Sequence, residues 1–267
     1  MIHSIRRPLA TALVAVALLA ASGCASSTPA PADSAPASAS DQLSGELTVF
    51  AAASLTAAFD ELSAQFEEQH PGVDVLPITY DGSSVLATQL IEGAPADVFA
   101  SADEKNLAKV TDAGLAGAGE AFATNVLQIA VAPGNPKGIE TLADLAGPDL
   151  TVVVCAAEVP CGSASHTLLD AAGVTLTPAS EEQNVTAVLS KVRSGEADAG
   201  LVYTTDVIAA GDEVTGIEID GADAATNVYP IVALTASKNP DVAQAFIEFV
   251  LSDAGQKVLK DLGFGAP

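Results

Sequence analysis

An apolar run meets a serine, and a helical pattern begins there, in the stretch Leu47-Thr48-Val49-Phe50-Ala51-Ala52-Ala53-Ser54-Leu55. The same device returns in the stretch Val73-Asp74-Val75-Leu76-Pro77-Ile78-Thr79-Tyr80-Asp81-Gly82-Ser83-Ser84. At such a junction the serine hydroxyl and the free N–H groups of the first helical turn converge on one point, which favours an anion. The chain itself is acidic, with 10 Lys and Arg residues against 34 Asp and Glu residues. The sequence therefore predicts anion sites that are built from neutral donors.

The first 23 residues have the pattern of a secretory leader. Arg6 and Arg7 form a basic start, and the apolar run from Leu9 to Ala20 is too short for an ordinary membrane span. The segment Ala21-Ser22-Gly23-Cys24 resembles the lipobox of bacterial lipoproteins, which implies cleavage before Cys24 and lipidation of its sulfur. An ordinary signal peptide followed by a chance cysteine is the alternative. We expect a protein that is lipid-anchored to the cell membrane, on its extracytoplasmic face.

An Ala/Ser/Pro-rich segment over 24–44 follows the leader and predicts a disordered tether. Loss of the leader removes Arg6 and Arg7 from the 10 basic residues and no acidic residue, which leaves 8 against 34, or −26. A charge of this sign repels nucleic acid and anionic lipid, so we expect no nucleic-acid partner. The sequence has no D-x-D-x-D-G loop and no His/Cys cluster, so we expect no bound metal cation.

Two cysteines, Cys155 and Cys161, remain after Cys24. An extracytoplasmic compartment permits them to pair, and we favour a disulfide over two free buried thiols. The small loop that this bond closes would add roughly 2–3 kcal/mol of stability in the chain-entropy model. A zinc site is disfavoured because no other cysteine or nearby histidine pair completes four ligands.

From Glu46 onward, strand-like runs alternate with helical patterns. We predict a strand over Leu47–Ala52, a helix over Ser54–Gln69 and a strand over Val73–Thr79. Such alternation implies an α/β fold with a parallel sheet and helices on both of its faces. Two long strand-like segments, 125–132 and 227–234, are each typical of a chain crossing. They predict lobe one over 45–124 plus 229–267, lobe two over 125–228, and a ligand cleft between them.

A set of motifs occurs in order along the chain. They are Val49–Leu55, Gly82–Ser84, Gly93–Asp103, Val159–Gly162, Gly200–Asp206, Tyr229–Ile231 and Gly263-Phe264. The set resembles that of the molybdate-binding proteins, the substrate-binding components of ABC importers, over essentially all of residues 46–267. The resemblance implies a two-lobed periplasmic-binding-protein-like fold of type II, in which a two-segment hinge joins the lobes.

The resemblance also implies a ligand set. In that family two serines of lobe one, backbone N–H groups and one tyrosine hydroxyl of lobe two hold the oxyanion. The matching positions here are Ser54, Ser83, Cys161 and Val185 (through their backbone N–H groups in lobe two), and Tyr203. Charge-assisted hydrogen bonds of roughly 1.5–3 kcal/mol each can offset the cost of dehydrating a dianion, so the set needs no lysine or arginine.

Two positions depart from the family pattern. Cys161 stands where a small residue is common, which is harmless if only its N–H is used. Tyr80-Asp81-Gly82 stands where serine or alanine is more usual, and an Asp81 carboxylate inside the pocket would repel a dianion. We expect Asp81 to point away from the pocket or to cap the following helix.

The resemblance implies a monomeric receptor that closes around molybdate, with no cofactor, and delivers it to an ABC transporter permease. Tungstate has nearly the same size and charge and should bind as well. A receptor for another tetrahedral oxyanion such as sulfate is the near alternative, because the sequence does not give the size of the cavity. A serine hydrolase is a remote alternative, since the chain has no G-x-S-x-G elbow and no histidine in a triad motif. We therefore do not expect an enzyme.

Overall fold

The computed structural model describes residues 43–267. The predicted leader over 1–23, the lipidation site Cys24 and nearly all of the tether over 24–44 lie outside the described residues. Within the described range, no helix combines the length and the apolar character that crossing a membrane would need.

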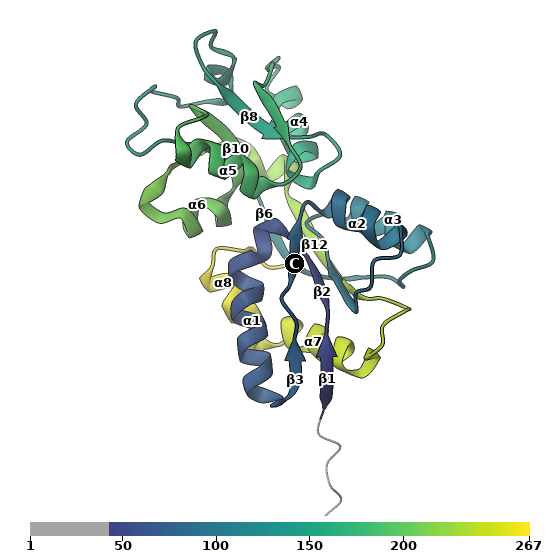
Figure 1. The fold of residues 1–267 in the computed structure, drawn as a ribbon. Helices are drawn as coiled ribbons and strands as arrows, with labels where there is room; N and C mark the ends of the chain where they lie inside the picture. Colours follow the sequence, from purple (N-terminus) through teal and green to yellow (C-terminus); the bar gives the residue numbers. More distant parts are fainter. Residues whose placement is uncertain (1–42) are drawn as a thin grey trace, which may run out of the picture. The chain divides into compact units, whose positions relative to one another are not determined.

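Two five-stranded sheets, one in each of two lobes, organise the described residues (Figure 1). The lobe-one sheet has the order β4-β2-β5-β12-β6. Its strands are β2 (Val49–Ala52), β4 (Thr79–Asp81), β5 (Val98–Ala100), β6 (Glu120–Asn125) and β12 (Asn227–Ala233). β1 (Ser44–Leu47) and β3 (Gly72–Val75) form a separate parallel pair.

Alternating side chains of the lobe-one sheet pack against different helices. Val49 and Ala51 of β2 belong to a core with α1 (Thr56–Gln69), α7 (Pro240–Leu251) and α8 (Asp253–Asp261). Phe50 belongs to a core with α2 (Ser83–Ile91) and α3 (Glu104–Asp112). Successive residues of a strand point to opposite faces, so the two helix layers cover the two faces of this sheet, as Figure 1 also shows.

The lobe-two sheet has the order β11-β7-β10-β8-β9. Its strands are β7 (Leu127–Val131), β8 (Val152–Cys155), β9 (Ser180–Glu182), β10 (Ala199–Tyr203) and β11 (Thr215–Glu218). The helices of this lobe are α4 (Pro160–Ala171), α5 (Val185–Ser194) and α6 (Thr204–Ala210). The core of lobe two is formed only by residues between Leu127 and Ala225, so each lobe has its own core.

The predicted parallel sheet is found only in part, because each lobe combines parallel and antiparallel pairs. β12 runs antiparallel to β5 and β6, and β7 runs antiparallel to β10 and β11. These antiparallel strands lie where the chain crosses between the lobes: β6 ends at Asn125 in lobe one, and β7 begins at Leu127 in lobe two. Two neighbouring strands are parallel when a helix connects them. A strand that crosses from the other lobe has no such helix before it in its new sheet, so it is free to run antiparallel.

Three predicted strands are each divided in two. The strand over 47–52 breaks at Thr48, whose N–H donates to the Asp97 carboxylate at 2.8 Å. The strand over 73–79 breaks between β3 and β4, around Pro77, which has no N–H for a sheet ladder. The segment over 125–132 breaks at Val126, between the two lobes.

Candidate functional site

A small cavity of about 10 Å³ lies between the lobes, where strands β2, β4 and β10 end. Its lining consists of Ala52, Ala53, Ser54, Asp81, Gly82, Ser83, Ala102, Val159, Pro160, Cys161, Val185 and Tyr203. The structure thus brings together all five residues that the sequence analysis singled out for the ligand. The carboxyl ends of parallel strands are where α/β proteins place their ligands, and the position fits that rule.

Lobe one contributes two serines, and each hydroxyl has a structural partner. Ser54 lies in a short 3₁₀ turn that follows β2, and its Oγ lies 2.9 Å from the Tyr229 hydroxyl. Ser83 opens α2, and its Oγ accepts a hydrogen bond from the Ala102 N–H at 2.9 Å. A serine oxygen that accepts a bond retains its proton, so the Ser83 hydroxyl is free to donate into the cavity.

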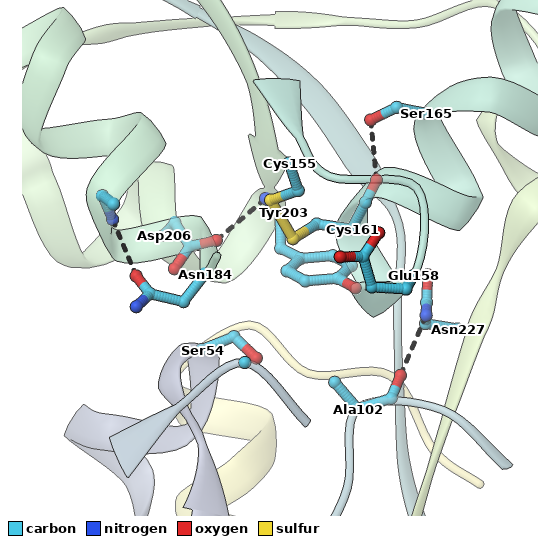
Figure 2. Close-up of a disulfide and its surroundings, with 12 residues drawn as sticks. Ser54, Ala102, Cys155, Glu158, Cys161, Ser165, Asn184, Tyr203, Asp206 and Asn227 are labelled. Atoms are coloured by element: carbon cyan, nitrogen blue, oxygen red, sulfur yellow. Dashed lines mark hydrogen bonds between the residues drawn. A yellow bond between two sulfur atoms is a disulfide. The ribbon is translucent and has the colours of Figure 1, made fainter. Parts of the chain in front are cut away.

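Tyr203 ends β10 and lines the cavity from lobe two. The side chain is 1% exposed, and its hydroxyl has no hydrogen-bond partner among the described residues. Burial raises the pKa of this phenol well above its ordinary value, and the neighbouring Tyr229 adds to the shift. The hydroxyl therefore keeps its proton at neutral pH and needs an acceptor. Figure 2 shows Tyr203 and Cys161 on one side of the site and Ser54 on the other.

Two helices of lobe two begin at the cavity. Cys161 is the second residue of α4 and Val185 is the first residue of α5. The first N–H groups of a helix have no acceptor within the helix, and they lie at the positive end of its dipole. The α4 start has no side-chain cap, and in α5 the Asn184 cap accepts only from Ala187. The backbone N–H groups of Cys161 and Val185 are therefore candidate donors to an anion.

The α4 start is tied covalently to the end of β8. Cys155 and Cys161 form a disulfide with 5.7 Å between their Cα atoms, which is the pairing that the sequence favoured (Figure 2). Both half-cystines are buried. The next residue, Gly162, packs so closely that an added Cβ would lie 1.9 Å from the Ala156 carbonyl oxygen. The disulfide and the glycine together hold the first turn of α4 against the loop that lines the cavity.

Sequence reasoning missed the groups that lie behind the lining. Tyr229 on β12 is fully buried between the Ser54 hydroxyl and the Asn125 amide, which donates to it at 3.5 Å. Asp206 in α6 accepts a hydrogen bond from the Tyr203 N–H at 2.9 Å (Figure 2). Burial raises the pKa of Asp206 to about 7. Both residues stand within quoted motifs, but nothing in the pattern distinguishes a supporting residue from a core residue.

Asp81 does not cap α2, so this part of the expectation is wrong. The helix α2 begins after Gly82 without any side-chain cap, and Asp81 is among the residues that line the cavity. Its Oδ1 instead accepts hydrogen bonds from the Gly82 N–H at 2.7 Å and from the Asn184 amide of lobe two at 2.8 Å. A cap needs the side chain to turn back over its own helix, whereas Asp81 reaches across the cleft.

The cavity is lined mainly by neutral donors. No lysine or arginine is among its lining residues, and Asp81 is the one acidic residue among them. Within residues 43–267 no group of three or more His, Cys, Asp or Glu residues is placed to hold a metal ion. This set of donors can hold an anion by hydrogen bonds and helix dipoles.

A larger cavity of about 430 Å³ lies at the other end of strands β2 and β5, beside Thr48 and Asp97. Both oxygens of Asp97 already accept hydrogen bonds, from the N–H groups of Thr48 and Lys238 and from the Ser237 hydroxyl. These three donors are therefore committed to the Asp97 carboxylate and are not free to hold an anion.

Comparisons with known proteins agree with this geometry. Residues 47–265 match the family described as bacterial extracellular solute-binding protein. The molybdate-binding protein ModA of Mycobacterium tuberculosis is 48% identical over 222 residues, which are 83% of this chain and 85% of that protein. A sulfate-binding protein of Synechococcus elongatus is more distant, with 27% identity, 82% of this chain and 72% of that protein.

The fold has solved counterparts. The periplasmic molybdate-binding protein of Azotobacter vinelandii matches with a TM-score of 0.72 and 24% identity, over 83% of this chain and 99% of that one. At this identity the likeness concerns the fold alone, and that fold is the two-lobed one that the sequence predicts. These relatives are binding proteins, in agreement with the expectation that the chain is a binding protein and not an enzyme. The chain belongs to the bacterial extracellular solute-binding proteins and, among them, to the ModA family of molybdate-binding proteins.

Proposed function

We propose that this protein binds molybdate between its two lobes and delivers it to the permease of an ABC transporter. The observation that carries the proposal is the Tyr203 hydroxyl, which is buried at the cavity and has no partner among the described residues. A buried hydroxyl without a partner costs free energy, and a bound oxyanion would supply the missing acceptor. The likeness to ModA supports the choice of ligand.

The donor set suits a tetrahedral dianion. Such an ion presents four oxygens, and each accepts more than one hydrogen bond. Ser54, Ser83 and Tyr203 offer hydroxyls from two sides, and Cys161 and Val185 offer backbone N–H groups. Because none of these donors carries a charge, the ligand is not held by an ion pair, and this favours release to a permease.

Tungstate shares the charge and nearly the size of molybdate, so we propose that it binds as well. Sulfate is the second candidate, since a sulfate-binding protein is among the relatives. It is a smaller ion with shorter bonds to oxygen, and a cavity fitted to molybdate would lengthen every contact to it. Sulfate should therefore bind more weakly.

Calorimetric titration of the purified protein with molybdate, tungstate, sulfate and phosphate tests this proposal. Molybdate and tungstate should give similar dissociation constants, and sulfate should bind at least about tenfold more weakly, a difference of about 1.4 kcal/mol. Absence of heat with molybdate would reject the molybdate receptor. Equal affinity for sulfate would replace it with a general oxyanion receptor.

The remaining expectations also stand as proposals. We propose lobe boundaries close to the expected 45–124 plus 229–267 and 125–228, moved so that Asn125, Asn227 and Val228 belong to lobe one, because β6 and β12 are strands of the lobe-one sheet. We propose that the protein is a monomer and that a lipid on Cys24 anchors it to the outer face of the membrane. Mass spectrometry of the mature N-terminus tests the anchor, because lipidation adds the mass of acyl chains to a peptide that begins at Cys24.

A further inference from the structure

The two lobes touch beside the cavity through short segments of adjacent residues. Asp81 and Gly82 come from lobe one, and Gln183 and Asn184 come from lobe two. The Asn184 Nδ2 donates a hydrogen bond of 2.8 Å to Asp81 Oδ1, although the two residues are 103 positions apart. In each lobe the contact lies next to a candidate ligand donor, Ser83 in one case and Val185 in the other.

Asn184 is held in the orientation that this contact needs. Its Oδ1 accepts a hydrogen bond from the Ala187 N–H at 2.9 Å and so caps α5. With the oxygen committed to the helix, the amide NH₂ points toward Asp81. Asp81 Oδ1 is oriented in turn by the Gly82 N–H at 2.7 Å. A bond to a carboxylate is stronger than one between neutral groups, so this contact should contribute more to closure than the longer cross-lobe bond from Asn106 Nδ2 to the Glu158 carbonyl oxygen at 3.4 Å.

Gly82 allows the backbones to approach. A Cβ at this position would lie 2.0 Å from the Gln183 carbonyl oxygen and 3.2 Å from Val159 Cγ1, both in lobe two. The backbone conformation of Gly82, with φ −60° and ψ 136°, is one that any residue adopts. The requirement for glycine therefore comes from the neighbouring lobe and not from local geometry.

We infer that Asp81, Gly82 and Asn184 form a latch that stabilises the closed arrangement of the lobes and positions the donors of Ser83 and Val185 around one ligand. Asp81 and Asn184 act here as positioning residues. The inference rests on the proposed function for its ligand but not for its geometry. Any opening of the cleft separates Asp81 from Asn184, so the bond biases the equilibrium toward the closed state.

The latch also gives a role to a carboxylate at an anion site. The negative charge of Asp81 opposes a dianion in the cavity, while its hydrogen bond across the cleft favours closure. Two substitutions separate these effects. Asp81→Ala removes the charge and the acceptor, whereas Asp81→Asn removes the charge and retains an acceptor oxygen for Asn184. A latch predicts weaker binding in Asp81→Ala and recovery in Asp81→Asn.

The test is a double-mutant cycle read by molybdate calorimetry. Asn184→Ser is the partner variant, because serine still caps a helix but does not reach Asp81. Asp81→Ala and Asn184→Ser should each weaken binding by about tenfold, and the double variant should be no weaker than either, since all three lack the same bond. Additive losses would overturn the latch. Tighter binding in Asp81→Ala would show that Asp81 only repels the anion.

A distance measurement tests the latch without a ligand. Spin labels on the exposed residues Glu92, which follows α2, and Ser190 of α5, introduced as cysteines, report the separation of the lobes. In the ligand-free protein, Asp81→Ala and Gly82→Ala should shift the distances to longer values. Gly117→Ala is the matched control, because a Cβ at Gly117 meets nothing within 4 Å. Unchanged distances in Asp81→Ala and Gly82→Ala would overturn the inference.

The two experiments distinguish an error in the proposed function from an error in the latch. If the parent protein does not bind molybdate, the proposed function is wrong, and the label distances still decide whether the latch exists. If the parent binds and the variants bind equally well, the proposed function stands and the latch is wrong. A fall in thermal stability without any change in affinity or in label distance would assign these residues a structural role only.

Discussion

Lobe one brings two side-chain hydroxyls to the cavity, whereas lobe two brings the first N–H groups of two helices and one phenol. The hydroxyls of lobe one are hydrogen-bonded within the protein, through Ser54 to Tyr229 and through Ser83 to Ala102. In lobe two a disulfide fixes the α4 start, and the Tyr203 hydroxyl has no partner among the described residues. Loss of a lobe-one hydroxyl should therefore affect folding and binding together, while loss of the phenol should affect binding alone.

The largest effect is expected at Asp206, which lies behind Tyr203 in lobe two. Burial raises its pKa from 3.8 to about 7, so the folded protein binds a proton that the unfolded chain releases between these values. The contribution of this group to the free energy of unfolding is therefore greatest below pH 3.8 and falls as the pH rises toward 7. The fall amounts to up to about 4 kcal/mol, at 1.36 kcal/mol for each pKa unit.

Asp206→Asn isolates this contribution, because the asparagine oxygen still accepts from the Tyr203 N–H and does not titrate. Urea unfolding should show that the variant gains stability relative to the parent as the pH rises from 4 to 7. The other carboxylates titrate equally in both proteins, so their contributions cancel in the difference between the two stabilities. A difference that does not vary with pH would mean that Asp206 is ionised throughout this range.

The disulfide is expected to have the next largest effect. The Cys155→Ala/Cys161→Ala variant loses a bond that spans 6 positions of the chain, and the chain-entropy relation gives about 2 kcal/mol for a loop of this size. The α4 start also loses its covalent attachment, so molybdate binding should weaken as well. Urea unfolding and calorimetry measure the two effects. Reductant should change neither value in the variant, and a variant as stable as the oxidised parent would contradict the prediction.

A direct comparison of the two lobes comes from Ser83→Ala and Tyr203→Phe. Each removes one donor to the anion and should weaken molybdate binding by about 1–2 kcal/mol, the usual cost of one lost hydrogen bond. Ser83→Ala also leaves the buried Ala102 N–H without its acceptor, so its stability should fall. Tyr203→Phe removes a hydroxyl that has no partner among the described residues, so its stability should not fall. Equal losses of stability would remove the distinction between the lobes.

The site was more predictable from the sequence than the sheets were. Ser54, Ser83, Cys161, Val185 and Tyr203 lie at strand ends and helix starts, and these junctions are marked by short motifs that the chain retains. Sheet direction is a property of the whole chain path. The antiparallel β7 and β12 follow from the crossings between lobes, and no local pattern reports which sheet a strand enters after a crossing.

Contacts across the cleft were also beyond the sequence. Asp81 was expected to point away from the pocket or to cap α2, because an acidic residue next to a helix start favours a cap. Its partner, Asn184, lies 103 positions away in the other lobe, and only the folded chain places the two together. The same applies to Tyr229, which no local pattern connects with Ser54.

The smallest effect is expected for Tyr229→Phe. The Tyr229 hydroxyl lies 2.9 Å from Ser54 Oγ, where either hydroxyl can donate, and it accepts from the Asn125 amide at 3.5 Å. When Tyr229 donates this bond, Ser54 keeps its own proton for an anion in the cavity. Without this partner the Ser54 hydroxyl is free to rotate, and molybdate binding should weaken by less than about 1 kcal/mol.

Calorimetry in a Ser54→Ala background tests this path. If Tyr229 acts only through Ser54, Tyr229→Phe should change the affinity of the parent and leave that of Ser54→Ala unchanged. An equal change in both backgrounds would mean that Tyr229 acts on Tyr203 instead, whose ring it contacts edge-on at 6.0 Å. In that case the 3₁₀ turn alone would orient the Ser54 hydroxyl of lobe one, and Tyr229 of β12 would instead orient Tyr203 of lobe two.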